Sequence, residues 1–171
     1  MMELVVAVDL GWGIGNNGEL LCRVSDDLKN FRAVTTGKTV ILGSKTLSTF
    51  PGGRPLKNRR NIIMSRRPDY VVEGAEVAHS PEELLSMLGE GENAVVIGGE
   101  SIYRLLLPYC DRAVISKFDI DLPKDAFFPA LDSDPDWFVS AQSETFTASE
   151  TDSHPGMKWK ICYYERKGEN K

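Results

Sequence analysis

The carboxylate at position 27 is the side chain best placed for acid–base chemistry. Asp27 and Phe31 are four residues apart and Leu28 lies beside them, so a helix over 26–35 would carry Asp27 on its apolar side. A carboxylate there is partly desolvated, which makes its pKa adjustable and favours a cationic or amidine-like partner such as a heterocyclic substrate. The structural alternative is an N-cap at Ser25 followed by acids that favour the helix dipole.

Two strand-to-helix turns carry glycine where a phosphate could bind. Val40–Thr46 and Val95–Tyr103 each combine a buried strand, a glycine and a helix start. Such turns leave backbone N–H groups free at the carboxyl end of a sheet, and a pair of them suits a dinucleotide. The alternative is ordinary backbone chemistry, because glycine is common at tight turns. Neither Gly11–Gly15 nor Gly37–Thr39 completes a known phosphate-binding motif.

Basic residues are concentrated between positions 54 and 67, where six of the 20 lysines and arginines occur without an acid. A solvated loop is the usual explanation of a basic run. Here the basic residues lie on both sides of a predicted strand, so each end of that strand has its own basic group. Arg66, with Ser65, follows that strand and could hold an extra phosphate. The six are Arg54, Lys57, Arg59, Arg60, Arg66 and Arg67.

Metal and disulfide chemistry are not indicated. Cys22, Cys110 and Cys162 are odd in number and form no C-x-x-C motif, so we expect free thiols. His79 and His154 lie far apart without a metal-binding pattern around them. We therefore expect no metal site.

Short runs rich in valine and isoleucine alternate with helical patterns, which is typical of an α/β fold with a largely parallel sheet. The predicted strands cover 4–8, 39–42, 61–64, 71–77, 94–97 and 113–118, with the first at the centre. Segments 137–142 and 158–166 are expected to form an antiparallel hairpin at one edge. The predicted helices cover 26–35, a short stretch after Ser44, 82–88 and 100–107, the third with Ser80 as N-cap.

Two connections are predicted to be irregular. Gly11–Arg23 is a long glycine-rich loop after the first strand, which favours a mobile lid over the site. Residues 148–156 are polar and turn-forming, which indicates a flexible surface loop.

Length and charge exclude several classes of protein. The 171 residues, 42% of them hydrophobic, suit a single domain spanning 1–171. A net charge of −5 leaves no overall basic surface for nucleic acid. No apolar run approaches a membrane span, and the first residues lack the basic region of a signal peptide. We therefore expect a cytoplasmic protein that binds neither nucleic acid nor membrane.

Taken in order, these segments resemble the dihydrofolate reductase family nearly end to end. The resemblance implies a single-domain, doubly wound, mixed and mostly parallel sheet of about eight strands, with about four helices. It also implies a cytoplasmic monomer that reduces 7,8-dihydrofolate to tetrahydrofolate with NADPH, for one-carbon metabolism. The segments that carry it are Val6–Asp9, Ile14-Gly15, Asp27–Phe31, Gly43–Thr46, Arg59–Ser65, Val96–Gly99, Asp125–Pro129 and the closing hairpin.

By this resemblance, Asp27 is the catalytic residue, binding the amidine-like edge of the pterin and supporting protonation of the ring nitrogen beside the carbon that receives hydride. Arg59 would clamp the glutamate α-carboxylate through its planar fork, with a one-residue error toward Arg60 left open. The implied substrate-binding residues are Val5, Val6, Ala7, Asp27, Leu28, Phe31, Phe50, Leu56, Arg59, Ile97, Tyr103 and Ser116.

The resemblance also implies the residues that bind NADPH. The turn after Gly43 would meet the pyrophosphate and the 2′-phosphate, Ser65 and Arg66 would close on that phosphate, and a cis peptide would join Gly98 to Gly99. The implied set is Ala7, Ile14, Gly15, Leu20, Gly43, Ser44, Lys45, Thr46, Met64, Ser65, Arg66, Ile97, Gly98, Gly99, Glu100, Ser101, Ile102 and Tyr103.

Three positions depart from the family pattern. Cys22 stands where the family has a tryptophan that orients a water near the carboxylate, and a thiol cannot replace an indole N–H. Ser25 replaces a proline. Glu100 places an acid near the pyrophosphate, which weakens nucleotide binding unless its side chain turns to solvent.

Two alternatives stay open at this point. A riboflavin-pathway reductase would share the fold and cofactor but act on a phosphoribosylated pyrimidine, and Asp27 and Arg59 favour folate over it. A nucleotide-binding relative with weak catalysis is the second, suggested by Cys22 and Glu100.

Overall fold

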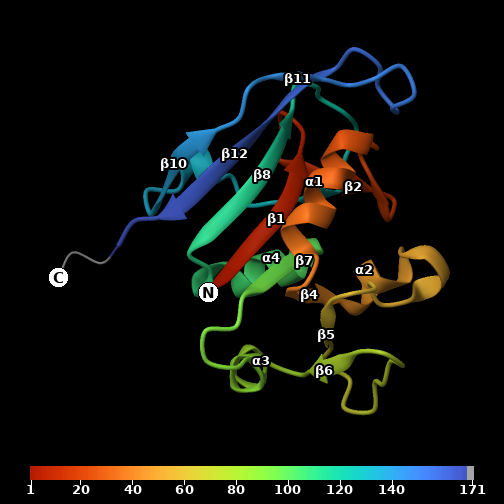
Figure 1. Ribbon diagram of the computed structural model, residues 1–171, viewed down its shortest axis with the longest axis vertical. Coiled ribbons are helices and arrows are strands. Elements are labelled where there is room, and N and C mark those ends of the chain that lie inside the picture. The colour runs from red at the N-terminus through yellow and green to blue at the C-terminus, as the bar shows by residue number, and fades with distance from the viewer. Residues whose placement is uncertain (169–171) are drawn as a thin grey trace.

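The computed structural model describes residues 1–168 and shows a twisted nine-stranded sheet with helices on both faces (Figure 1). The strands run in the order β10-β12-β8-β1-β7-β4-β5-β6, with β11 beside β12. The strands are β1 (Met2–Val8), β4 (Thr39–Gly43), β5 (Arg60–Met64), β6 (Glu76–Ala78), β7 (Ala94–Gly98), β8 (Arg112–Phe118), β10 (Trp137–Gln142), β11 (Phe146–Thr147) and β12 (Lys158–Arg166). The helices are α1 (Ser25–Thr35), α2 (Ser44–Ser48), α3 (Pro81–Met87) and α4 (Glu100–Leu106), and short 3₁₀ turns cover Pro51–Gly53, Leu107–Tyr109 and Leu131–Ser133.

The six strands from β8 to β6 pair in parallel, with β1 near the centre as predicted. Alternate residues of β1 point to opposite faces, and both faces are covered. Leu4 packs in the cluster that contains Leu84 of α3 and Leu106 of α4. Val5 packs in the cluster that contains Leu47 of α2 and against which Phe31 of α1 lies. The apolar runs therefore form a core of two layers, with α1 and α4 on opposite faces (Figure 1).

The C-terminal strands are antiparallel, as predicted. Strand β12 lies between β8 and β10 and pairs antiparallel with both, so β12 itself is not at the edge of the sheet. The short β11 pairs with the beginning of β12. In this antiparallel register, Ile161 of β12 lies opposite Ser116 of β8.

The predicted strand over 71–77 is wrong for most of its length. Strand β6 begins only at Glu76, and Val71 is 85% exposed. Gly74 has a positive φ of 83°, and the Ala75 N–H donates to the Val72 carbonyl, so the chain turns where extension was expected. The valines of this segment therefore lie in a connection.

The predicted loop Gly11–Arg23 contains regular structure. It forms β2 (Gly13–Asn16) and β3 (Glu19–Leu20), which join β9 (Ala126–Phe127) in a separate three-stranded sheet of order β3-β2-β9. We call this the small sheet. Its strand β9 comes from a point more than 100 residues further along the chain, so local sequence patterns could not show the pairing.

The first helix is capped by a distant loop. Ser25 is its first residue and not its N-cap, because Val24 holds that position without a side-chain bond. The Asp152 carboxylate accepts from the Ser25 N–H at 3.0 Å, and Ser153 pairs with the backbone of Arg23. The connection over 148–156, predicted as a flexible loop, is thus hydrogen-bonded to the start of α1. The other predicted cap, Ser80, accepts from the Glu83 N–H as expected.

Among residues 1–168, no helix has both the length and the apolar character that a membrane crossing requires.

Candidate active site

Asp27 points from α1 toward the sheet, where its Oδ1 accepts a hydrogen bond from the Ser116 hydroxyl of β8. Ser116 lies opposite Ala7 of β1 in the parallel register. Burial raises the pKa of Asp27 to about 6, and the bond from Ser116 offsets part of that rise. Oδ2 makes no hydrogen bond to any residue that the structure describes. The site thus holds a carboxyl that can gain or lose a proton near neutral pH and has one oxygen free.

The side chains predicted to surround a substrate divide between the two faces of the sheet. The face that carries α1 holds Val5, Ala7, Phe31, Phe50, Leu56 and Ile97 in one apolar cluster. Leu28 is 42% exposed on α1. Val6 and Tyr103 belong to the cluster on the opposite face, and the Tyr103 hydroxyl donates to the Val5 carbonyl at 2.7 Å. Asp27 therefore stands beside an apolar wall that six of the predicted residues build.

Cys22 is buried in the cluster that forms this wall. Burial, together with the carboxylates of Asp9 and Asp27, raises the pKa of the Cys22 thiol to about 11. At neutral pH the thiol is therefore neutral and a weak nucleophile. Position 22, where the resemblance implies an indole, thus holds a small uncharged side chain.

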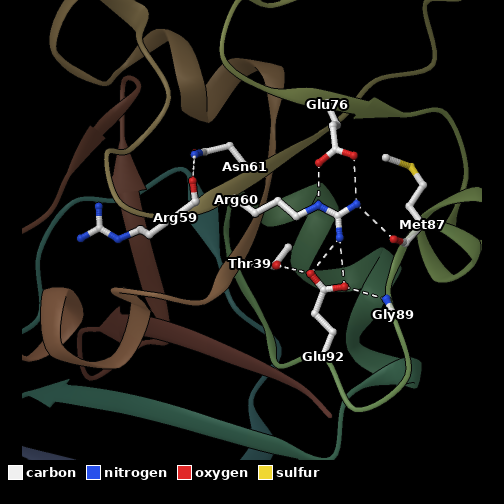
Figure 2. A network of polar contacts seen from close by, with 8 residues as sticks. All are labelled: Thr39, Arg59, Arg60, Asn61, Glu76, Met87, Gly89 and Glu92. Atoms are coloured by element: carbon white, nitrogen blue, oxygen red, sulfur yellow. Dashed lines mark hydrogen bonds and ion pairs between the residues drawn. The ribbon is translucent and has the colours of Figure 1, made fainter.

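Arg59 and Arg60 are adjacent, but their side chains point in different directions (Figure 2). Arg60 lies between two carboxylates, bound to Glu76 at 2.6 Å and to Glu92 at 2.8 Å. Arg59 makes two weaker contacts, to the Lys57 carbonyl at 3.1 Å and to the Thr36 hydroxyl at 3.3 Å. The buried Nε of Arg59 has no hydrogen-bond partner among the described residues. Within the described residues, Arg59 is therefore the one of the two whose guanidinium pairs with no carboxylate.

A second cation faces Arg59 from α1. Burial, and then repulsion by Arg32, lower the pKa of the Arg59 guanidinium. Arg32 lies one residue after Phe31 on α1 and was not among the residues predicted from the sequence to form the site. Two positive charges without a carboxylate between them favour an anion at this end of the site.

Arg60 supports the fold, and we expect Arg60→Met to lower the free energy of unfolding by about 1–3 kcal/mol. The substitution leaves Glu92 with only the Thr39 hydroxyl and the Gly89 N–H, which together with Arg60 lower the pKa of its carboxyl to about 2. Urea unfolding measures the change. Lys57→Met, at an exposed neighbour, is the control, and an equally small effect of both substitutions would contradict a structural role for Arg60.

Three parallel strands end side by side and bring most of the predicted nucleotide-binding residues together. In the register, Leu42 of β4 lies opposite Gly98 of β7, and Gly43 lies opposite Met64 of β5. The turns that follow carry Ser44, Lys45 and Thr46, Ser65 and Arg66, and Gly99, Glu100, Ser101 and Ile102. The sequence-predicted turns thus form one continuous edge.

The glycines of this edge are required by close contacts. A Cβ on Gly99 would lie 3.0 Å from the Thr46 hydroxyl, and one on Gly43 would lie 2.9 Å from Cγ1 of Ile102. Gly98 has a φ of 138°, and the Gly98–Gly99 peptide is cis, as predicted. Helices α2 and α4 begin without a side-chain cap, so their first N–H groups stay free for a ligand.

Ala7 of this set lies in β1, and three further predicted nucleotide-binding residues lie in the small sheet. Ile14 and Gly15 belong to β2, and Leu20 of β3 is 56% exposed. Sequence reasoning missed the residue that organises this region, Asp9. Its buried carboxylate accepts from the N–H groups of Gly11 and Gly13 at 3.0 and 2.8 Å. An aspartate followed by spaced glycines is a turn signal that could have indicated this role.

Within the described part of the chain, no three histidine, cysteine, aspartate or glutamate side chains gather in a way that could hold a metal ion.

Comparison with known proteins identifies the family. A match to the family described as dihydrofolate reductase covers residues 1–166. The dihydrofolate reductase of Mycobacterium tuberculosis is 34% identical over 170 residues, covering 97% of this chain and 98% of that protein. That of Bacillus subtilis is 32% identical over 171 residues, with coverage of 100% and 98%. The structure of the Enterococcus faecalis dihydrofolate reductase complexed with NADP(H) and RAB-propyl superposes with a TM-score of 0.87 at 31% identity, covering 98% and 97% of the two chains.

The fold, the edge of three strand ends and the half-buried carboxyl beside an apolar wall define an NADPH-dependent oxidoreductase. The chain belongs to the dihydrofolate reductase family. These relatives support reduction of dihydrofolate and give no support to the pyrimidine-reducing alternative.

Proposed function

We propose that Asp27 and Arg59 hold 7,8-dihydrofolate at opposite ends of one pocket while it is reduced by NADPH. The overall change consumes one NADPH and one proton and releases tetrahydrofolate and NADP⁺. The observation that carries the proposal is the half-buried Asp27 carboxyl, with a pKa of about 6 and one oxygen free, beside the apolar wall on the α1 face. A pKa near the working pH is what proton transfer requires.

Asp27 would act through its two oxygens separately. Ser116 holds Oδ1, which orients the carboxyl, while Oδ2 accepts from the amidine-like edge of the pterin. At a pH near its pKa, the same group holds a proton for part of the time and supports protonation of the ring nitrogen next to the reacting carbon. The apolar wall excludes water from this pair, which strengthens the interaction.

Arg59 would bind the other end of the substrate. Its unpaired Nε and its neighbouring cation Arg32 fit a carboxylate, and the planar fork allows two parallel hydrogen bonds. Glu76 and Glu92 already occupy the Arg60 guanidinium, which supports Arg59 and not Arg60 in this role.

The residues of the three strand ends fit NADPH, which supplies hydride when bound. The glycine turns leave no room for a Cβ and offer uncapped N–H groups to phosphate oxygens. Ser44, Lys45 and Thr46 would hold the pyrophosphate side, and Ser65 and Arg66 the 2′-phosphate. Gly98–Gly99 would place backbone against the nicotinamide.

We expect Arg66→Ala to weaken NADPH binding by about tenfold while leaving NADH binding within about twofold. Arg66 is exposed, and its side chain makes no hydrogen bond or ion pair within residues 1–168, so the substitution removes no internal contact. Fluorescence titration with both nucleotides measures the ratio. Arg67→Ala is the control, because Arg67 lies over the Tyr70 ring, and an equal loss for NADH would contradict a 2′-phosphate contact.

The activity itself is tested by NADPH consumption with 7,8-dihydrofolate, followed optically beside a reaction without folate. Folate-dependent turnover is the expected result. A folded protein that binds NADPH but does not oxidise it with dihydrofolate would refute the proposal and leave a nucleotide-binding role.

The free, buried thiols also support the cytoplasm as the compartment, because they suit a reducing environment.

A further inference from the structure

Glu100 links helix α4 to the small sheet, beside the ends of the three parallel strands. It is the first residue of α4 and follows Gly98–Gly99 directly. Its Oε1 accepts a hydrogen bond from the backbone N–H of Phe127, at 2.6 Å. Phe127 belongs to β9 of the small sheet. The acid that the sequence placed beside the pyrophosphate is thus bound to the small sheet, and a charged acceptor makes this a strong type of hydrogen bond.

Strand β9 connects the small sheet to the rest of the fold. Phe127 lies opposite Gly13, and the backbone N–H groups of Asp125 and Phe128 donate to Gly15 and Trp12 at 3.1 and 2.8 Å. Within residues 1–168, strand β3 pairs only with β2, on the side away from β9. A shift of β9 therefore carries the β2–β3 hairpin with it.

An apolar contact of Phe128, the residue that follows β9, holds this part of the chain to α4 independently of Glu100. The buried Phe128 ring lies edge-on to the Tyr103 ring, with centroids 5.0 Å apart, and stacks at 6.4 Å on Trp12. Tyr103 is itself fixed by its bond to the Val5 carbonyl. Loss of the Glu100 side chain therefore removes the polar contact while this aromatic contact remains, so a variant at position 100 keeps its fold.

We propose that Glu100 is a positioning residue. It holds the small sheet against the Gly98–Gly99 turn and thereby slows release of the nucleotide. The inference rests on the proposed function in that the nucleotide is NADPH. Two properties of the side chain act in opposite directions. Its negative charge repels phosphate groups, which weakens binding, while its bond to β9 keeps the hairpin of Ile14, Gly15 and Leu20 in place.

Two substitutions separate these effects. Glu100→Gln removes the charge and keeps an oxygen that can accept from Phe127. Glu100→Ala removes both. Glu82→Ala is the matched control, because Glu82 occupies the first turn of α3, is exposed, and accepts no hydrogen bond within the described residues.

The bond to β9 is tested in the nucleotide-free protein by amide hydrogen exchange at Phe127. We expect exchange about tenfold faster in Glu100→Ala, less than about threefold faster in Glu100→Gln, and unchanged in Glu82→Ala. Unchanged exchange in Glu100→Ala would overturn the proposal. This readout does not depend on the reductase activity.

The coupling is tested by the rate of NADPH dissociation, measured in a stopped-flow experiment with a competing nucleotide. We expect dissociation at least about threefold faster in Glu100→Ala, and equal to or slower than wild type in Glu100→Gln. Faster Phe127 exchange without faster NADPH dissociation would overturn the coupling. A wild-type protein that fails to bind NADPH would instead refute the proposed function, while the exchange measurement would still decide whether Glu100 holds β9.

Discussion

Asp27→Asn is expected to lower kcat/KM for dihydrofolate at pH 7 by about 100-fold or more. Asparagine has nearly the shape of aspartate and keeps an oxygen for Ser116, so the pocket is preserved. It cannot hold a proton on an acid group or carry the charge that the amidine-like edge of the substrate pairs with. The loss therefore reports the acid–base and charge contributions of Asp27 together, apart from its shape.

The loss should depend on pH. In the wild-type protein the carboxyl has a pKa of about 6, so it holds a proton below that pH and loses it above. In Asp27→Asn the proton can come only from solvent, through substrate already protonated, so the deficit should shrink below about pH 5. Single-turnover rates across pH measure this. Asp26→Asn, at an exposed neighbour bound to Lys29, is the control, and an unchanged pH profile in Asp27→Asn would contradict the role.

The same substitution should make the protein more stable at neutral pH. The pKa of Asp27 is higher in the folded chain than its ordinary value of 3.8, so the folded state binds the proton more tightly than the unfolded state. The free energy of unfolding therefore falls as pH rises from about 4 to about 6, by about 1–3 kcal/mol. Thermal melts should show Asp27→Asn above wild type at pH 8 and equal to it at pH 3.5. A lower melting temperature at pH 8 would argue that the carboxylate is not desolvated.

Arg59→Met is expected to raise KM for dihydrofolate by about 30-fold and to change kcat by less than about threefold. In the proposed binding mode the guanidinium contacts a part of the substrate that does not react, so its loss should weaken ground state and transition state equally. No acid in the described structure pairs with Arg59, so its removal leaves no buried carboxylate behind.

A substrate without the glutamate makes this test specific. With 7,8-dihydropteroate, wild type and Arg59→Met should have similar KM values, because this substrate lacks the carboxylate that we propose Arg59 binds. An equal loss with both substrates would show that Arg59 acts on the pocket wall and not on the carboxylate. Lys57→Met is the control, because it removes a nearby positive charge from an exposed position. We expect it to leave both KM values unchanged.

The sequence predicted the central sheet and the position of the Asp27 carboxyl because both depend on short-range patterns. Runs such as Val40–Leu42 have few explanations other than strands buried on both faces. Asp27 could be placed because the spacing to Phe31 defines one face of a helix. The same reasoning located the two glycine turns, since a strand, a glycine and a helix start are consecutive in the chain.

Features that depend on distant partners could not be predicted. The small sheet pairs Gly13 with Phe127, and α1 is capped by Asp152. In both cases the partner lies far along the chain, so the residues around Gly13 or around the start of α1 do not reveal it. The choice between Arg59 and Arg60 required the positions of Glu76 and Glu92, which follow in later elements. Composition alone made Val71–Val77 look extended, although a turn at Gly74 interrupts it.

The measurement that tests the central claim most directly is the titration of the Asp27 carboxyl in the folded protein. Infrared difference spectra between wild type and Asp27→Asn isolate this group from the other acids. A midpoint near pH 6 is the predicted result, and it would show a desolvated acid able to hold a proton in the pocket. A midpoint near pH 4 would show a solvated carboxylate and would contradict its role in supporting protonation of the substrate.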